Sequence, residues 1–308
     1  MELRHIRYFL AIAEEKNFTR AAARLGIGQP PLSQQIRDLE REVGTPLFHR
    51  VPHGAELTEA GRAFWEVVSR LPPQVAEAMH AAQRAARGET GALRLGFTGT
   101  AVLNPVVPAC IREFRRHYPQ VEIRLMETNS ALLVQALVEK RLDVAIVRPA
   151  EGSPPTVVHH LLTEENLVAA LPAAHPAAQE GGEADTGIAL ASLKDDPFIL
   201  TPRSIGSSLH DTVLASCRAA GFTPTQGQAA PQIASMLSLV SAELGVALVP
   251  ESMQQLKVHG VVYRPIGGGE PPRVSLSVAH LDSQTLPQAH NFVALAQSLG
   301  SGGKSGQK

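Results

Sequence analysis

The sequence predicts an α + α/β fold, in which a small helical module and a linker helix precede a larger α/β domain. Three observations predict it. Apolar residues recur at helical spacing from Leu3 to Val43. Beyond residue 92, strand-like and helix-like segments alternate, which favours a sheet with crossover helices. The chain has 308 residues, which is enough for two domains with separate cores.

The N-terminal module begins with an amphipathic helix expected over residues 3–14, and two further helices follow it. Asn17 is a suitable N-cap for the second helix. Pro30 or Pro31 fits the first turn of the third helix, where a missing N–H costs little. A helix-turn-helix needs two short helices and a tight turn at this spacing to place its second helix in the DNA major groove. Residues 17–37 therefore predict a DNA-binding protein.

A hairpin is expected next. Residues 47–51 and 55–58 flank Pro52-His53-Gly54 and are expected to pair as a wing beside the third helix.

A linker helix is expected to begin after Thr58, which is a suitable N-cap. The dipeptide Pro72-Pro73 interrupts it, because proline inside a helix removes a hydrogen bond and clashes with the preceding turn, at a cost of roughly 3 kcal/mol. We therefore expect a break near Arg70. A second helical segment over 74–87 and an interdomain hinge at residues 88–91 follow.

The α/β domain is predicted from the alternation that follows. Residues 177–187 are polar and glycine-rich and predict a loop, and residues 300–308 predict a disordered tail. Strands are expected over 93–97, 121–127, 143–147, 167–171, 198–201, 246–249, 261–264 and 274–279, and helices over 104–117 and 130–140.

Charge is distributed unevenly, although the net charge is only −1. Residues 18–37 hold three arginines and no acid, and residues 43–55 also lack acids. A surface that meets DNA must avoid carboxylates, because phosphate contacts supply most of the nonspecific affinity. The distribution therefore favours DNA contact by these segments, with a chance gap between acids as the alternative.

The predicted DNA contacts come from the third helix, the start of the second and the wing. Glutamine can read adenine, arginine can read guanine or hold phosphate, and proline can touch a thymine methyl group. An ion pair with Asp38 or Glu40 is the alternative for Arg37, and a solvated turn is the alternative for His53. Thr19, Arg20 and Arg50 suit phosphate or, in the wing, the minor groove. The predicted set is Thr19, Arg20, Gln29, Pro30, Pro31, Ser33, Gln34, Arg37, Arg50 and His53.

A ligand site is expected at the carboxyl ends of the strands, where open α/β domains bind ligands. The segments after three of the strands are rich in hydroxyls and helix-start amides, which suit a carboxylate. Arg203 adds a bidentate clamp. Helix capping alone is the alternative for Thr100 and Ser130. The residues predicted here are Thr98, Gly99, Thr100, Asn129, Ser130, Pro202, Arg203 and Ser204.

Six ordered motifs lie in the first 60 residues, namely Leu3-Arg4-His5-Ile6-Arg7-Tyr8-Phe9, Asn17-Phe18-Thr19-Arg20-Ala21-Ala22, Gln29-Pro30-Pro31-Leu32-Ser33, Ile36-Arg37-Asp38-Leu39-Glu40, Gly44-Thr45-Pro46-Leu47-Phe48 and Leu57-Thr58-Glu59-Ala60-Gly61. Through these motifs the first 60 residues closely resemble the LysR-type transcriptional regulators, and the resemblance continues more weakly over residues 92–298. It implies a winged helix-turn-helix, a dimerisation helix, and a two-lobed α/β effector domain like the type 2 periplasmic binding proteins. It also implies a homodimer or homotetramer that binds double-stranded promoter DNA, a small carboxylate inducer and RNA polymerase, with no cofactor.

The chain departs from the family pattern at two places, namely Pro72-Pro73 and Glu243, where glycine is usual. The expected division is a DNA-binding domain over 1–58, a linker helix over 59–88, an effector domain over 89–299 and a tail over 300–308. Within the effector domain, lobe I spans about 92–162 and 268–299, and lobe II spans about 163–267.

Residues 96–101 resemble regulators of aromatic-acid and catechol catabolism. By this resemblance Thr100, Ser130 and Pro202 line the inducer cleft, and Arg148 matches a position that can form a second pocket. The implied effector is a small aromatic acid or a muconate-like diacid.

Three other classes of protein are less favoured. An enzyme would need paired carboxylates, a Ser-His-Asp order or metal-ligand spacing, and none stands out. The adjacent His159 and His160 are expected on opposite faces of a strand, in structural or solvated roles. A thiol sensor would use Cys110 and Cys217, although free core cysteines are the commoner interpretation. The chain enters patterned helix directly after Met1, and no apolar run reaches the roughly 18 residues of a membrane span. We therefore expect a cytoplasmic protein, which disfavours an exported solute-binding protein.

Overall fold

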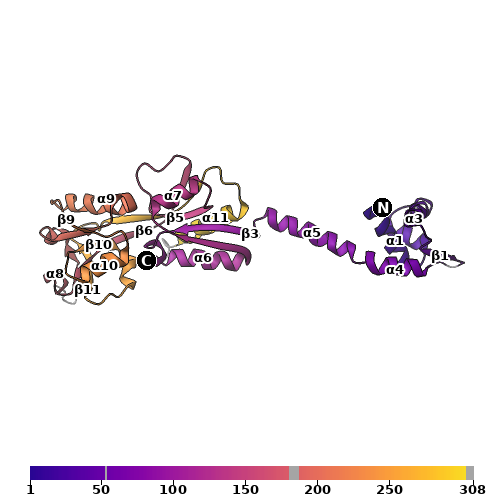
Figure 1. Cartoon of the computed structure of the whole chain (residues 1–308), viewed down its shortest axis with the longest axis horizontal. Coiled ribbons are helices and arrows are strands. Elements are labelled where there is room, and N and C mark those ends of the chain that lie inside the picture. Colours follow the sequence, from indigo (N-terminus) through magenta and orange to yellow (C-terminus); the bar gives the residue numbers. More distant parts are fainter. Residues whose placement is uncertain (53, 180–186, 303–308) are drawn as a thin grey trace. The chain divides into compact units, whose positions relative to one another are not determined.

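The computed structural model describes residues 1–52, 54–179 and 187–302, and it divides into two compact units, Met1–Arg84 and Ala85–Lys308. The first unit holds three helices, a hairpin and two further helices (Figure 1). Their bounds are α1 Leu3–Glu15, α2 Phe18–Leu25, α3 Gln29–Val43, β1 Phe48–Val51, β2 Gly54–Leu57, α4 Glu59–Val68 and α5 Leu71–Ala86.

The local signals of the first unit are confirmed. The Asn17 side chain accepts hydrogen bonds from the backbone N–H groups of Thr19 and Arg20 at 2.9 and 3.0 Å and caps α2. The Thr58 hydroxyl accepts from the Gly61 N–H at 2.9 Å and caps α4. The hairpin pairs as expected, with Phe48 opposite Leu57. Phe9, Ile12, Leu32, Ile36, Leu39 and Leu47 are almost fully buried in one core.

The predicted break in the linker helix is also confirmed. Helix α4 ends at Val68 and α5 begins at Leu71. Pro72 and Pro73 therefore lie in the first turn of α5, where the backbone N–H groups would have no partner inside the helix. Helix α5 starts three residues before the expected Gln74 for this reason.

The second unit contains a mixed sheet in the order β4-β3-β5-β12-β6-β11-β7, with β10 also pairing β6, and a separate pair β8-β9. The strands are β3 Thr90–Phe97, β4 Gln120–Glu127, β5 Val144–Val147, β6 Val157–Pro172, β7 Ile188–Ala189, β8 Pro197–Leu200, β9 Thr225–Ala229, β10 Ala247–Pro250, β11 Val261–Gly267 and β12 Arg273–Leu281. The helices are η1 Ala101–Leu103, α6 Val106–His117, α7 Ser130–Val138, α8 Pro176–Gln179, η2 Leu190–Leu193, α9 Arg203–Ala219, α10 Ile233–Ser241, η3 Glu251–Gln255 and α11 Pro287–Gly302.

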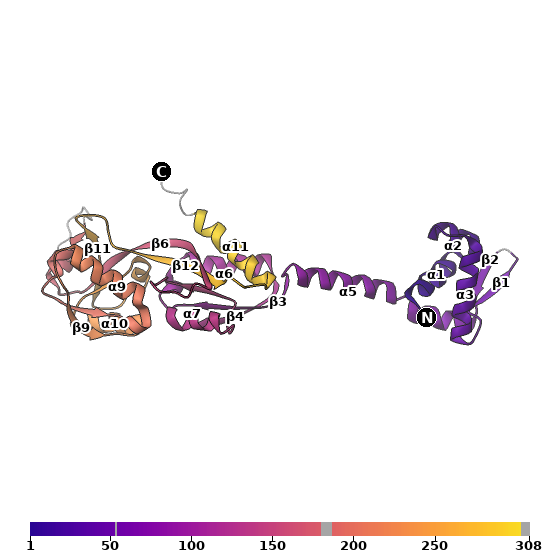
Figure 2. The same ribbon diagram turned by 90° about the horizontal axis from the view of Figure 1, so that it is seen from above.

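Strand β6 joins two lobes of this unit (Figure 2). It pairs with β12 over Val157–Asn166, and then with β10 and β11 over Leu167–Pro172. Lobe I consists of β3, β4, β5, β12 and the first part of β6, with α6 and α11 packed on one side and α7 on the other. Lobe II is layered in the same way, since α9 packs on one hydrophobic core and α10 packs on a second, separate core. The predicted two-lobed α/β architecture is confirmed.

Several segments differ from the sequence expectation. The strand expected at 167–171 is only the second half of β6, and β7 and β9 were not expected. Strand β9 has no apolar alternation, since all of its residues are exposed. Residues 177–179 belong to α8, and 300–302 belong to α11 rather than to a tail, while 180–186 and 303–308 lie outside the described residues. None of the described helices combines the length and apolar character that crossing a membrane requires.

Candidate functional site

Helix α3 buries one stripe of side chains and exposes another. Leu32, Ile36 and Leu39 are at most 1% exposed and anchor the helix to α1 and α2. Gln29, Pro30, Pro31, Gln34 and Arg37 are exposed on the helix and make up the polar outer face, hereafter the reading face.

The acids near α3 are occupied by other partners. Glu40 accepts hydrogen bonds from the backbone N–H groups of Leu47 and Phe48 at 2.8 and 3.1 Å. Asp38 forms an ion pair with Arg41 at 3.0 Å. Among the described residues no acid forms an ion pair with Arg37, whose guanidinium instead donates to Gln34 Oε1 at 2.9 Å. The charge of Arg37 therefore remains available at the surface.

Ser33 differs from the other predicted residues of α3. It is only 5% exposed, and its hydroxyl accepts a hydrogen bond from Gln29 Nε2 at 2.9 Å. Ser33 and Arg37 are four residues apart, but α3 packs Ser33 toward the core. In this structure the hydroxyl of Ser33 thus positions Gln29 instead of lying on the reading face.

Two further arginines of the first unit, Arg50 and Arg20, have exposed side chains. Arg50, on β1, is exposed, and its guanidinium carbon lies 5.3 Å from the centre of the Phe18 ring. Such an arrangement is a cation–π contact, which holds the charge in place without neutralising it. Arg20 and Thr19 are exposed at the start of α2, and Arg20 donates to the Glu15 carbonyl at 2.5 Å. His53 lies outside the described residues.

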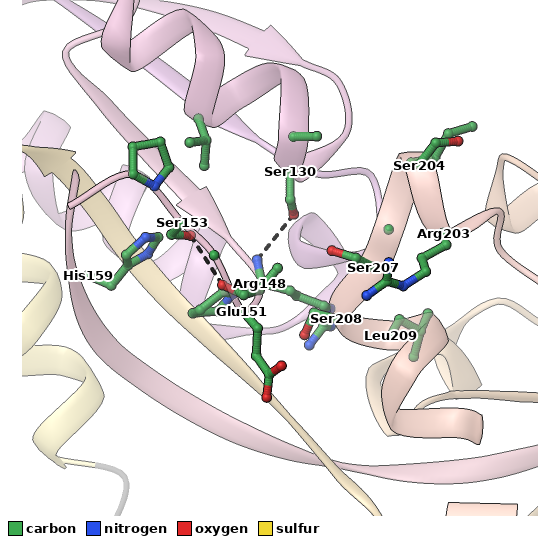
Figure 3. Close-up of a pocket in the computed structure, with 18 residues that line it drawn as sticks. Ser130, Arg148, Glu151, Ser153, His159, Arg203, Ser204, Ser207, Ser208 and Leu209 are labelled. Carbon is green, nitrogen blue, oxygen red and sulfur yellow. Dashed lines mark hydrogen bonds between the residues drawn. The ribbon is translucent and has the colours of Figure 1, made fainter. Parts of the chain in front are cut away.

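A second candidate site is a hollow of about 260 Å³ in the second unit, shown in Figure 3. Helix α7 and the segment after β5 line it from lobe I, and the first turns of α9 line it from lobe II. Of the predicted effector residues it contains Ser130, Arg148, Arg203 and Ser204. Thr98, Gly99, Thr100, Asn129 and Pro202 do not line it. The Thr98 hydroxyl accepts a hydrogen bond from the Ala101 N–H at 3.2 Å, and Asn129 caps α7 by accepting a hydrogen bond from the Leu132 N–H at 3.0 Å.

Arg148 is the most unusual residue of this hollow. It is 5% exposed and forms an ion pair at 2.5 Å with Glu165, which is also buried. Its Nε and Nη1 atoms are buried, and no group among the described residues accepts a hydrogen bond from them. Leaving a buried donor unsatisfied costs about 1–3 kcal/mol, and more for a charged group. Ser130 Oγ accepts from the Arg148 backbone N–H at 3.3 Å, which ties α7 to the end of β5.

The guanidinium of Arg203 already has a carboxylate partner within the protein. Its Nε and Nη2 donate to the two carboxylate oxygens of Asp211 at 2.9 and 3.0 Å. This bond raises the pKa of Arg203 and lowers the pKa of Asp211. The bidentate partner that the sequence analysis assigned to a ligand is in this structure a neighbour on the same helix.

Sequence reasoning missed several lining residues. His159 lines the hollow, both of its ring nitrogens are buried with no hydrogen-bond partner in the part of the chain that the structure describes, and burial lowers its pKa. The neutral ring can donate one hydrogen bond and accept another. Ser207, Ser208 and Ser153 add hydroxyls, and Glu151 adds an exposed negative charge. The serine-rich start of α9 was visible in the sequence, but nothing local indicated that it would face α7.

The two cysteines are buried in different lobes. Cys110 lies in the core under α6, and Cys217 lies in the core under α9. Burial raises the pKa of each thiol to about 11. Because the thiolate is the reactive form, neither cysteine has the environment of a redox sensor.

Comparison with known proteins gives matches along most of the chain. Residues 3–62 match the family model for the bacterial regulatory helix-turn-helix protein of the lysR family, and residues 86–300 match the LysR substrate binding domain. The chain is 40% identical over 267 residues to the HTH-type transcriptional regulator BudR of Raoultella terrigena, covering 86% of this chain and 90% of BudR. It is 37% identical over 265 residues to the HTH-type transcriptional regulator AlsR of Bacillus subtilis, covering 86% and 85%. The crystal structure of full-length CbnR complexed with its target DNA superposes with a TM-score of 0.78 at 27% identity, covering 97% of this chain and all of CbnR.

Proposed function

We propose that this chain, which belongs to the LysR family of transcriptional regulators, reads the base sequence of promoter DNA with the outer face of α3. Binding of a small carboxylate between lobes I and II changes how the protein contacts that DNA. The alternative, a thiol sensor, is disfavoured by the burial of both cysteines.

The reading face supports the DNA half of the proposal. It presents amide, guanidinium and proline groups, and the acids beside it are bound by other groups of the domain, Glu40 by backbone N–H groups and Asp38 by Arg41. Gln29, Gln34 and Arg37 are the groups proposed to meet base edges, and Arg20 and Arg50 are proposed to hold phosphates. Thr19, Pro30 and Pro31 extend the same surface.

Arg148 carries the effector half. Its unpartnered Nε and Nη1 point to opposite sides of the guanidinium, so each can donate a hydrogen bond to a separate ligand oxygen, and the ion pair with Glu165 supplies only one of the contacts that a buried guanidinium needs. A hollow of about 260 Å³ suits a small molecule. We propose that the ligand is an aromatic acid or a muconate-like diacid, with Ser130, Ser207 and His159 binding its remaining oxygens.

Helix α5 supports an oligomer. It buries none of its residues within the single chain, and Met79 is 60% exposed. An exposed apolar helix face of this kind is covered when two copies pair. We propose a homodimer built on α5, as a step to a homotetramer, with RNA polymerase as a further partner at the promoter.

Selection from random duplexes tests the DNA half. The full chain is expected to enrich one sequence with two half-sites related by a two-fold axis. Recovery of duplexes without a shared sequence would refute reading by α3.

Thermal unfolding tests the effector half. Benzoate and cis,cis-muconate are expected to raise the melting temperature, while benzamide, which lacks the charge, is expected to leave it unchanged. Arg148→Met removes both donors and is expected to abolish the rise. Arg203→Met is the matched control, because Asp211 already occupies that guanidinium. An equal rise in Arg148→Met and in the parent chain would refute the proposed site.

A further inference from the structure

The hollow between lobes I and II offers more hydrogen-bonding groups than one carboxylate uses. Its hydroxyls come from Ser130, Ser153, Ser204, Ser207 and Ser208. Ser130 Oγ accepts from the Arg148 backbone N–H, and Ser153 Oγ donates to the Ala150 carbonyl at 3.3 Å, so each hydroxyl can form a further hydrogen bond. No phenylalanine, tyrosine or tryptophan stands among the described residues that line the hollow. A ligand that satisfies this lining therefore carries a polar group besides its carboxylate.

His159 indicates which polar group that is. Neither ring nitrogen has a hydrogen-bond partner among the described residues, and burial, with a smaller effect of His160, lowers the pKa of the ring. The ring is therefore neutral at pH 7 and has one N–H donor and one acceptor nitrogen. Because the χ2 torsion of histidine is broad, the ring can turn either nitrogen toward the hollow. The acceptor nitrogen is satisfied only by a donor on the ligand, which a carboxylate alone lacks.

Strands β5 and β6 present Arg148 and His159 to the same hollow. Strand β12 pairs with β5 on one side, and on its other side Ala279 lies opposite His159 of β6. The backbones of β5 and β6 therefore run about 10 Å apart. His160 points to the opposite face, where its Nε2 lies 3.1 Å from His280 Nε2 and helps to fix the register of β6. One small acid can thus contact Arg148 and His159 with different oxygens.

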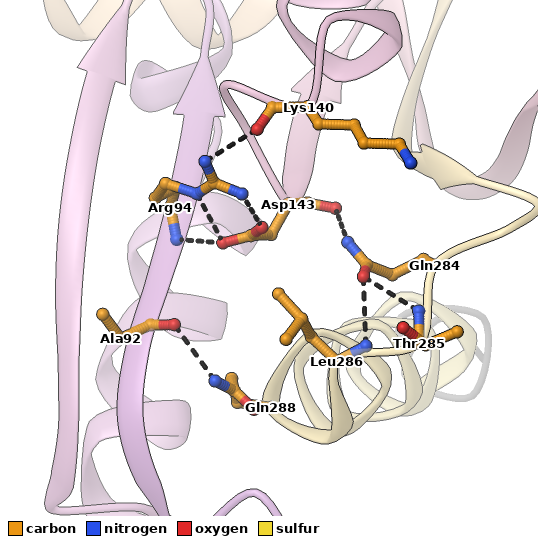
Figure 4. Close-up of polar contacts among 8 residues, drawn as sticks. All are labelled: Ala92, Arg94, Lys140, Asp143, Gln284, Thr285, Leu286 and Gln288. Carbon is orange, nitrogen blue, oxygen red and sulfur yellow. Dashed lines mark hydrogen bonds and ion pairs between the residues drawn. The ribbon is translucent and has the colours of Figure 1, made fainter.

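The start of β5 is held by the polar contacts that Figure 4 shows. Asp143 is 2% exposed, and its carboxylate accepts from the Arg94 backbone N–H at 2.8 Å and from Arg94 Nε at 3.1 Å. The Asp143 carbonyl accepts from Gln284 Nε2 at 3.1 Å, and Arg94 Nη1 donates to the Lys140 carbonyl at 2.7 Å. These contacts prevent β5 from sliding within its sheet. Arg148 therefore cannot shift to find acceptors inside the protein, and a ligand oxygen is left to satisfy its donors.

We infer that the effector is a carboxylic acid that also bears a hydroxyl group, and that His159 selects it by accepting a hydrogen bond from that hydroxyl. The inference rests on the proposed function and names the ligand class of the same site. Glu151 lines the hollow and repels a second carboxylate, so a hydroxylated aromatic acid is favoured over a diacid. An ammonium group in place of the hydroxyl is disfavoured, because it needs three acceptors and would lie beside the Arg148 cation.

Isothermal titration calorimetry of the full chain with benzoate and the three hydroxybenzoate isomers tests the inference. At least one isomer is expected to bind about tenfold more tightly than benzoate, which is the effect of one additional hydrogen bond to a buried group. Equal or weaker binding of all three isomers would overturn the inference without any variant. Tighter binding of the corresponding aminobenzoate would overturn the assignment to a hydroxyl.

His159→Phe tests the assigned residue. The ring shape is kept and the acceptor is lost, so the preference for the hydroxybenzoate is expected to disappear while benzoate binds as in the parent chain. His160→Phe is the matched control, because the neighbouring residue points to the other face of the sheet, and it is expected to keep the preference. Thermal unfolding checks that both variants are folded. An unchanged preference in folded His159→Phe would overturn the role of this residue.

The same titrations separate failure of this inference from failure of the proposed function. Benzoate binding that Arg148→Met abolishes, without any preference for a hydroxybenzoate, would overturn the hydroxyl and leave the proposed carboxylate site intact. Absence of binding by all of these acids would overturn the proposed effector and this inference together.

Discussion

Arg50→Ala is expected to weaken binding to every duplex and to flatten its dependence on salt. The Arg50 guanidinium is exposed and held over Phe18, and no described acid forms an ion pair with it. A contact with one phosphate of B-DNA contributes about −0.9 to the slope of log K against log salt. The slope is therefore expected to fall by about 0.9 for each contacting protomer. Between 50 and 200 mM salt, one such contact is worth about 3.5-fold in affinity.

Fluorescence anisotropy with a labelled duplex of arbitrary sequence, titrated at several salt concentrations, measures this slope. Arg24→Ala is the matched control: Glu14 and Glu15 bind the Arg24 guanidinium at 2.6 and 3.2 Å and raise its pKa, so its charge is already neutralised. Arg50→Lys keeps the charge and is expected to keep the slope. Loss of the ring contact costs about 0.5–1 kcal/mol, so thermal unfolding must show that Arg50→Ala remains folded. An unchanged slope in folded Arg50→Ala would refute the phosphate contact.

Three further outcomes follow from other parts of the chain. Gln34→Ala is expected to change the sequence recovered from random duplexes while leaving the salt slope intact, because the amide is uncharged; an unchanged selected sequence would contradict base reading. Glu243→Gly is expected to raise the free energy of unfolding by about 0.5–1 kcal/mol, because Glu243 has a φ of +61° in a helix-ending turn that favours glycine; a lower melting temperature would contradict this. Peroxide is expected to cause no mobility shift on a nonreducing gel at pH 8, because the pKa of Cys110 and of Cys217 is about 11 and only about one thiol in a thousand is ionised there, whereas the thiolate forms as pH rises toward 11. A shift at pH 8 would restore the sensor hypothesis.

The elements of the first unit were predictable because their signals are local. Asn17 and Thr58 cap the helices that they precede, and Gly44 ends α3 with a φ of +83°. Pro72 and Pro73 have no backbone N–H to donate, which suits the first turn of a helix, and the linker helix is interrupted just before them. In each case the physical cause lies within a few residues of its effect.

The effector hollow was only partly predictable for the opposite reason. The rule that ligands bind beyond the carboxyl ends of strands found Ser130 on α7 and Arg203 and Ser204 on α9. It also selected Thr98, whose hydroxyl is bound by the Ala101 N–H, and Asn129, which caps α7; neither lines the hollow. His159 was visible in the sequence but was assigned a structural role, because the length of β6 and the side of the sheet that it faces depend on the pairing with β12, more than 100 residues away.

The availability of each arginine is the clearest case of a property that sequence patterns do not determine. Arg24, Arg37 and Arg50 all lie in acid-poor stretches, and their local patterns do not distinguish them. In the fold, Glu14 and Glu15 of α1 form ion pairs with Arg24. Glu40 accepts a hydrogen bond from the Phe48 N–H at the start of β1, and the Phe18 ring lies against the Arg50 guanidinium. Contacts between different elements thus decide which arginine can bind a DNA phosphate and release its counterion. For this reason the salt slopes of Arg24→Ala and Arg50→Ala test the folded arrangement itself, since local charge alone would predict the same loss for both.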